Sequence, residues 1–153
     1  MKKIICFEGT SGSGKSTLCD LTVSYLNNHG TNAKKIKFPT GYLGNKIREA
    51  RNAEKRDPFL ESYLFACDFR HCYTHIVLPN AGCNTFVFDR SFVTSYADSN
   101  FGGNSLELIA NINRYNPIPD MLFILDCSPE RAVARINERN LIANLFNLGT
   151  FIY

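Results

Sequence analysis

Residues 9–17 read Gly-Thr-Ser-Gly-Ser-Gly-Lys-Ser-Thr and follow directly on the apolar run Ile4-Ile5-Cys6-Phe7 and Glu8. The spacing matches the pattern G-x-x-x-x-G-K-[ST], in which glycines let backbone N–H groups turn inward toward phosphate oxygens. A strand that ends at about Glu8 and a helix over residues 17–29 would place this loop at the positive end of the helix. Because strand, loop and helix fall where the motif requires them, a flexible Gly/Ser turn is disfavoured. The stretch predicts a site for a nucleoside triphosphate.

Within the loop, the side chains have predicted tasks. Lys15 is expected to reach the β- and γ-phosphates, and Ser16 to offer its hydroxyl to a magnesium ion that bridges them. The residues predicted to bind the triphosphate are Gly9, Ser11, Gly12, Ser13, Gly14, Lys15, Ser16 and Thr17. The apolar positions of the following helix are expected at Leu18, Leu21, Val23, Tyr25 and Leu26.

The chain has 153 residues, a net charge of +3 and ordinary apolar and charged fractions. These values predict one globular domain over residues 1–153 and exclude disordered and fibrous classes. The N-terminal apolar run is too short for a signal peptide, and no stretch is long enough to cross a bilayer, so we expect a cytoplasmic protein without a membrane partner. The charge is too small and scattered to predict nucleic-acid binding. The 6 cysteines form no C-x-x-C pair and are expected to be reduced and buried.

Short apolar runs alternate with helical stretches along the rest of the chain. This alternation predicts an α/β fold of the P-loop NTPase class, a three-layer sandwich whose central parallel sheet is buried on both faces by helices. The further strands are expected at residues 33–38, 85–88 and 121–125. The further helices are expected at residues 43–51, at 58–78 with Asp57 as the cap, at 105–115, and after the helix start Ser128-Pro129-Glu130.

Asp89-Arg90-Ser91 follows an apolar strand, and open α/β sheets bind ligands beyond the carboxyl ends of their strands. Asp89 is predicted to hold magnesium, usually through water, or to accept a proton from an attacking oxygen. Arg90 is predicted to bridge donor and acceptor phosphates and to stabilise transition-state charge. A surface ion pair is the alternative for an Asp-Arg dipeptide, but the position after a strand favours the functional interpretation.

Four separated segments give the chain a resemblance to the thymidylate kinases, which are P-loop nucleoside monophosphate kinases. Phe7-Glu8-Gly9 resembles the opening of that family, and residues 43–49 (Leu-Gly-Asn-Lys-Ile-Arg-Glu) resemble its L-G-x-K-I-R-E stretch. Asp89-Arg90 matches its D-R motif. Residues 119–139 follow its P-D-x-x-x-x-L-D, P-E and R-I-x-x-R patterns. The resemblance reaches from the N-terminus to about Arg139.

The resemblance implies that ATP is the donor, that Mg²⁺ is required and that the acceptor is a deoxynucleoside monophosphate, dTMP first of all. It implies catalytic roles for Lys15, Asp89, Arg90, Arg135 and Arg139, and a metal site at Ser16 and Asp89. Phe65 matches an aromatic residue that stacks on thymine, Arg48 and Arg90 match arginines near the acceptor phosphate, and Phe38-Pro39 would shape the same pocket. A place in an ordinary helix core stays open as the alternative for Phe65.

Arg131, Arg135 and Arg139 recur every four residues, so they are expected on one face of the last helix. One or two of them could reach the triphosphate, whereas many such rows are merely solvated. Arg135 and Arg139 fit the family pattern and Arg131 does not.

The chain also departs from the family. Ser11 stands where the family usually has a carboxylate near the acceptor sugar. The arginine that follows the stacking aromatic by four residues is replaced by Phe69, and the candidate for base recognition becomes Arg70, although a shift of one residue turns a helical side chain by about 100°. Residues 97–99 (Ala-Asp-Ser) replace the family's A-Y-Q. These departures leave the base preference open.

The tail over residues 140–153 contains no charge, and the C-terminal part is shortened relative to the family. After a helix that ends near residue 148, residues 149–153 are expected either to add a short edge strand or to belong to a divergent copy of the family. An uncharged, apolar terminus is also typical of an association surface, which leaves a homodimer open.

Two other functions remain as alternatives. A deoxynucleoside kinase would also carry such a loop and an acid-Arg-Ser triplet, with the carboxylate acting as base because a 5′-hydroxyl has a proton to lose. Against it, the second strand ends in Lys37-Phe38-Pro39, without the glutamate that such enzymes place there. The last alternative is a nucleotide-binding module without turnover.

Overall fold

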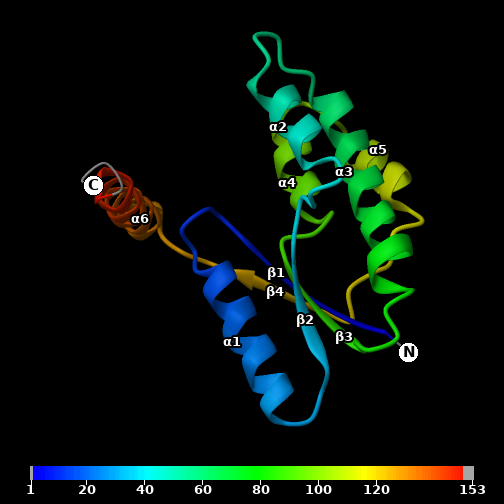
Figure 1. Ribbon diagram of the computed structural model, residues 1–153. Helices are drawn as coiled ribbons and strands as arrows, with labels where there is room; N and C mark the ends of the chain where they lie inside the picture. The colour runs from blue at the N-terminus through cyan, green and yellow to red at the C-terminus, as the bar shows by residue number, and fades with distance from the viewer. Residues whose placement is uncertain (1, 150–153) are drawn as a thin grey trace.

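Parallel strands form a central sheet in the order β2-β3-β1-β4 (Figure 1). The computed structural model describes residues 2–149, and their side chains apart from those of residues 98, 99, 101 and 141–149. The strands are β1 (Lys3–Gly9), β2 (Ala33–Lys37), β3 (Thr85–Asp89) and β4 (Met121–Leu125). The helices are α1 (Lys15–Asn28), α2 (Gly44–Asn52), α3 (Pro58–Cys72), the π-helical turn η1 (Tyr73–Val77), α4 (Thr94–Phe101), α5 (Leu106–Asn113) and α6 (Pro129–Gly149).

Alternating side chains of β1 belong to two hydrophobic clusters on opposite faces of the sheet. The sheet is therefore the middle layer between two layers of helices, as predicted. Ile4 and Cys6 belong to a cluster with the phenylalanines of α3, on the face that α2 to α5 cover. Phe7 packs with Cys19 of α1 on the opposite face. The predicted α/β sandwich with a central parallel sheet is therefore confirmed.

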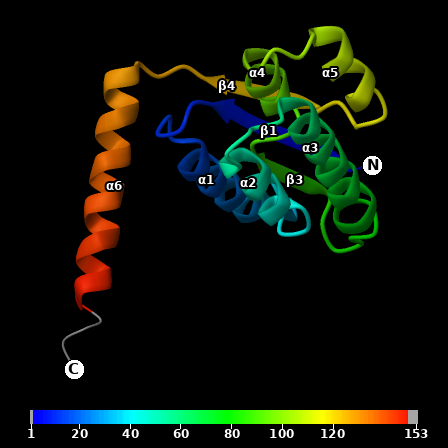
Figure 2. The same cartoon turned by 90° about the horizontal axis from the view of Figure 1, so that it is seen from above.

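The prediction that the sheet is buried on both faces is wrong for β4. All residues of β3 are buried, whereas Met121 and Ile124 of β4 are 56% and 72% exposed. In the described part of the chain β4 is an edge strand that pairs only with β1. α6 leads away from the sheet and does not return over β4 (Figure 2).

Most helix predictions hold within a few residues, with three differences. The predicted helix 58–78 begins as expected, with the Asp57 carboxylate accepting from the backbone N–H groups of Phe59 and Leu60 at 3.0 and 3.1 Å, but it changes to π-helix at Tyr73. α4 was not predicted, because its sequence is mostly small and polar. In α1 the buried apolar residue is Cys19, with Val23 and Leu26 partly buried beside it, whereas the predicted apolar positions Leu18, Leu21 and Tyr25 are exposed.

The end of the chain is described only in part. α6 ends at Gly149, close to the predicted end, and the expected edge strand at residues 149–153 lies outside the described residues beyond that point. Among the helices described, none combines the length and the apolar character that crossing a membrane requires.

Candidate active site

The phosphate loop connects β1 to α1 in the conformation that its glycines permit. Gly9, Gly12 and Gly14 have φ values of +140°, +83° and +98°. At Gly12 a side chain is also excluded by space, because a Cβ there would overlap the backbone carbonyl of Ala132 at the start of α6. The loop is thus closed on one side by α6, and α1 starts directly behind it at Lys15.

Lys15 is buried and bonds within the loop, donating to the carbonyl of Thr10 and, at 3.3 Å, to the hydroxyl of Ser13. Burial lowers the pKa of Lys15 below its ordinary value, and the positive charge of Arg90 lowers it further. A bound anion would offset both effects, since it would compensate the desolvated ammonium group.

The end of β3 lies beside the loop because β3 pairs with β1 in a register that sets Asp89 opposite Phe7. The hydroxyl of Ser16 donates to Oδ2 of Asp89 at 2.5 Å. Arg90 follows with φ +73°, a left-handed conformation that is uncommon for a residue other than glycine. Its Nη2 donates to the hydroxyl of Ser11 at 3.5 Å.

A buried carboxylate ties the loop strand to the residues after Arg90. Glu8 is 6% exposed, and its Oε1 accepts from the backbone N–H and the hydroxyl of Ser91 at 2.7 and 2.9 Å. Its Oε2 accepts from the hydroxyl of Thr94 at 2.8 Å. Because these bonds flank the strained backbone of Arg90, we infer that Glu8 holds Arg90 in place.

A first cavity, of about 390 Å³, brings the predicted catalytic residues together. We call it the loop cavity. It is lined by Ser11, Gly12, Gly14, Lys15, Ser16, Thr17, Lys37, Phe38, Asp89, Arg90, Arg135 and Arg139. Residues from the loop, β3 and α6 therefore converge as predicted, while Gly9 and Ser13 line neighbouring cavities instead.

A second cavity, of about 720 Å³, lies against the first, and we call it the Phe65 cavity. It is lined by Glu8, Gly9, Thr10, Ser11, Lys37, Phe38, Pro39, Arg51, Phe65, Arg90, Val93, Thr94, Ala97 and Ile124. The two cavities share Ser11, Lys37, Phe38 and Arg90. Phe65 is also 1% exposed and packs 5.7 Å from the ring of Phe38, so it serves as core and as cavity wall at once.

The chain that follows β2 is held over α3 by a second buried carboxylate. Asp68 has no exposed surface and accepts from the backbone N–H and the hydroxyl of Thr40, both at 2.6 Å. It also accepts from the backbone N–H of Leu43 at 3.1 Å. Asp68 thereby fixes the segment that carries Phe38 and Pro39 into the cavity wall.

Two predicted substrate-binding arginines are not among the residues that line the Phe65 cavity. Arg48 is exposed and bonds to Asn45 on its own helix. Arg70 donates to the carbonyl of Tyr115 at 2.6 Å and lines a different cavity, next to α5. The one-residue shift in α3 explains the second case, because Phe69 takes the inward position and is 1% exposed.

Arg51 lines the cavity instead, and the sequence reasoning missed it. A signal was present: Arg51 follows Ile47 by four residues, and Ile47 is 1% exposed. Positions four apart share a helix face, so Arg51 extends from the same inner face of α2 as Ile47, whereas Arg48 is turned about 100° from Ile47. Glu8 and Asp68 were also missed as positioning residues.

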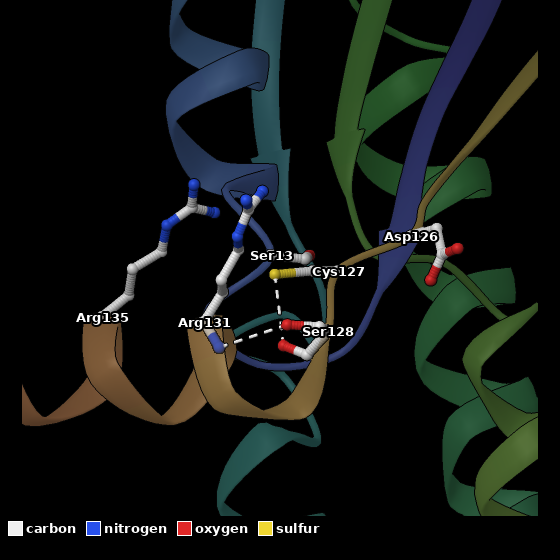
Figure 3. A pocket seen from close by; sticks show the side chains of 6 residues that line it. All are labelled: Ser13, Asp126, Cys127, Ser128, Arg131 and Arg135. Carbon is white, nitrogen blue, oxygen red and sulfur yellow. Dashed lines mark hydrogen bonds between the residues drawn. The ribbon is translucent and has the colours of Figure 1, made fainter.

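A third cavity, of about 430 Å³, lies on the other side of the loop and is shown in Figure 3. It is lined by Ser13, Asp126, Cys127, Ser128, Arg131 and Arg135. Arg131 and Arg135 leave the same face of α6, as their spacing predicted, and Arg135 donates to the carbonyl of Gly12 at 3.2 Å. Arg131, which does not fit the family pattern, thus reaches the neighbourhood of the loop.

The cysteines are unpaired, as predicted, but only four of them are buried. Burial raises the pKa of Cys6, Cys19 and Cys72 to about 12, so these thiols stay protonated near neutral pH. Cys67 is exposed and Cys127 is half-buried, which corrects the expectation that all are internal.

Known proteins resemble the chain over nearly its whole length. Residues 7–150 match the family model described as thymidylate kinase. The chain is 34% identical over 140 residues to a probable thymidylate kinase of Methanococcus aeolicus, covering 92% of this chain and 69% of the relative. It is 33% identical over 148 residues to the thymidylate kinase of Brachyspira hyodysenteriae, with 94% and 72% covered.

A solved structure of a thymidylate kinase is also similar to this chain. The crystal structure of thymidylate kinase from Ehrlichia chaffeensis superposes with a TM-score of 0.71 at 25% sequence identity. The match covers 95% of this chain and 82% of that one.

Proposed function

Because the chain belongs to the thymidylate kinase family of nucleoside monophosphate kinases, we propose that it transfers the γ-phosphoryl group of ATP to dTMP and forms ADP and dTDP. The observation that carries this proposal is the wall shared by the two cavities. Ser11 and Arg90 line both the loop cavity and the Phe65 cavity. A donor phosphate in the first and an acceptor phosphate in the second would meet at the Arg90 guanidinium.

On the donor side, the loop amides and Lys15 bind the phosphates of ATP. The hydroxyl of Ser16 and the carboxylate of Asp89, 2.5 Å apart, are hard oxygen ligands of the kind Mg²⁺ takes, so the residues present fit that ion. When bound, Mg²⁺ neutralises charge on the β- and γ-phosphate oxygens. Gly9, Gly12, Ser13, Gly14 and Thr17 complete the loop that surrounds them.

On the acceptor side, Arg90 positions the phosphate of dTMP, and Phe38, Pro39 and Phe65 wall the pocket of the nucleoside. An oxygen of that phosphate bonds to the γ-phosphorus of ATP while the bond from this phosphorus to the β–γ bridging oxygen breaks. An ionised phosphate oxygen has no proton to lose, so Asp89 is not needed as a base. Arg90, Arg135 and Arg139 stabilise the charge that spreads over the transferred group.

Enzyme assays with purified protein test the proposal. ATP consumption is measured with magnesium against dTMP, the other deoxynucleoside monophosphates and the free deoxynucleosides. We expect turnover with dTMP. Turnover with free deoxynucleosides alone would reassign the activity to that of a deoxynucleoside kinase. ATP binding without any turnover would favour the alternative of a nucleotide-binding module without catalysis. A cytoplasmic location and a homodimer stay predictions from the sequence.

A further inference from the structure

Arg51 lies in the wall of the Phe65 cavity, beside the ring of Phe65. Its guanidinium carbon lies 5.0 Å from the centre of the Phe65 ring, which is close enough for a cation–π contact. The side chain is 36% exposed. Arg51 and Phe65 belong to the part of the wall that the loop cavity does not share, and they come from α2 and α3 rather than from the phosphate loop.

The buried carboxylate of Glu61 binds the Arg51 side chain. The Glu61 side chain is 2% exposed, and its Oε2 accepts from Nε of Arg51 at 3.3 Å. The same carboxylate accepts from Nε and Nη2 of Arg56 at 2.5 and 2.9 Å. Burial raises the pKa of Glu61, but the hydrogen bonds and charges of Arg56 and Arg51 outweigh it and hold the pKa below its ordinary value. Arg56 does not appear among the residues that line the cavity.

The charges around the cavity suit a ligand that offers hydrogen-bond acceptors. Of the described side chains that line it, Glu8 is the only carboxylate, and its oxygens already accept from Ser91 and Thr94. Arg90 and Lys37 line the end shared with the loop cavity, where a phosphate belongs. Arg51 is the cationic donor in the part of the wall that the two cavities do not share, beside the Phe65 ring, on which a base can stack.

We propose that Arg51 is a specificity-determining residue that donates to the carbonyl oxygen at position 4 of the acceptor's pyrimidine. The proposal rests on the function proposed above. A guanidinium carries donors only. Thymine and uracil present an acceptor at position 4, whereas cytosine presents an amino group, whose hydrogens would face the donors of Arg51. Arg51 therefore selects dTMP and dUMP against dCMP.

The test compares two arginines that share one anchor. Arg51→Met removes the donors in the cavity, and Arg56→Met removes a partner of the same Glu61 outside it. The values of kcat/KM are measured for dTMP, dUMP and dCMP. We expect Arg51→Met to lower kcat/KM for dTMP and dUMP by about 10- to 100-fold and to leave that for dCMP nearly unchanged. Arg56→Met should leave the ratio of dTMP to dCMP as in the wild type.

A ratio that Arg51→Met leaves unchanged, or that Arg56→Met lowers equally, would overturn the proposal. If Arg51→Met does not fold, Arg51→Lys keeps the charge but loses the planar fork, and it should lower the same ratio by a smaller factor. If the wild-type protein turns over no nucleotide, the proposed function fails. Calorimetric binding of dTMP and dCMP to the wild type and to the two Met variants then measures the same ratio and decides the role of Arg51 separately.

Discussion

The loop cavity and the Phe65 cavity meet at Arg90 but are built in different ways. Half of the residues that line the loop cavity belong to the contiguous stretch 11–17. The Phe65 cavity takes its wall from β1, β2, α2, α3, α4, β4 and the segments that connect them, with single residues from most of these elements. The shape of the first wall follows from one contiguous stretch, whereas each residue of the second depends on how its own helix or strand packs, which is why Arg51 and not Arg48 lines it.

The largest effect is expected in the loop. Lys15→Ala should lower kcat/KM for ATP on the order of 10³-fold, because no other loop side chain supplies a cation to the transferred phosphates. Steady-state kinetics and ATP binding by calorimetry measure the change. Lys34→Ala, at an exposed lysine of β2, is the matched control and should behave as the wild type. An ATP affinity that stays unchanged in Lys15→Ala would contradict the proposal that the loop binds the phosphates of ATP.

Glu8 lines the Phe65 cavity and bonds to the residues after Arg90, which lines both cavities, so its loss should affect both. Glu8→Ala leaves the backbone N–H of Ser91 and two hydroxyls without their acceptor, which we expect to lower the free energy of unfolding by about 1–3 kcal/mol. Release of the strained Arg90 should lower kcat by about 10- to 100-fold. Glu8→Gln keeps the size and an acceptor oxygen and should recover most of kcat. An equal loss of kcat in both variants would show that the negative charge of Glu8 is needed. An unchanged kcat in Glu8→Ala would contradict the inference that Glu8 holds Arg90 in place.

Asp68 distinguishes the two cavities, because the segment that it holds contributes Phe38 and Pro39 to the Phe65 cavity but only Phe38 to the loop cavity. Asp68→Ala should raise KM for dTMP by about 10-fold and leave KM for ATP near the wild-type value, since the segment around Thr40 loses its anchor. Thr40→Val removes one of the three donors and should give a smaller rise. The two KM values, measured side by side, are the readout. A parallel rise in KM for ATP would show that Asp68 supports the whole sheet edge rather than one cavity.

Lowering the pH should destabilise the folded protein through protonation of Glu61, the carboxylate that binds Arg51. Its pKa is lower in the folded protein than the ordinary 4.5, so the ionised form stabilises the fold above that pH, and the contribution is lost as the pH falls through the lower folded value. Urea unfolding of the wild type and of Glu61→Gln at several pH values measures it. The difference in unfolding free energy should be constant above about pH 5.5 and shrink below pH 4.5. A difference that grows toward acid pH would reverse the sign and refute the assignment.

The smallest effects are expected for the cysteines. With the folded protein near pH 8, iodoacetamide should label exposed Cys67 and half-buried Cys127, and leave Cys6, Cys19 and Cys72, whose thiols are buried and protonated. Mass spectrometry after digestion reads the labelled sites. ATP should slow labelling of Cys127, beside the loop, and leave Cys67 unaffected. Protection of Cys67 alone would place the nucleotide elsewhere.

The sequence predicted the elements better than their surroundings. Strand Met121–Leu125 has the predicted bounds, yet its apolar residues are largely exposed, because burial depends on what packs over a strand and not on its composition. In α3 the one-residue shift already indicated that Arg70 would point away from the inward position of Phe69, yet Arg70 was kept as a substrate-binding candidate, and the structure places it beside Tyr115 instead. The same argument applied to α2 would have favoured Arg51 over Arg48, but the family resemblance pointed to Arg48.

By itself, the sequence determined the phosphate loop, the parallel α/β order and the approach of Asp89 to the loop. These follow from glycine conformations, apolar periodicity and the edge at which parallel strands end, all of which are local or topological. Only the tertiary structure decided that Arg51 and not Arg48 or Arg70 enters the Phe65 cavity, and that Glu8 and Asp68 position its walls. Those choices depend on the rotation of each helix against its neighbours, which packing sets and no single segment encodes.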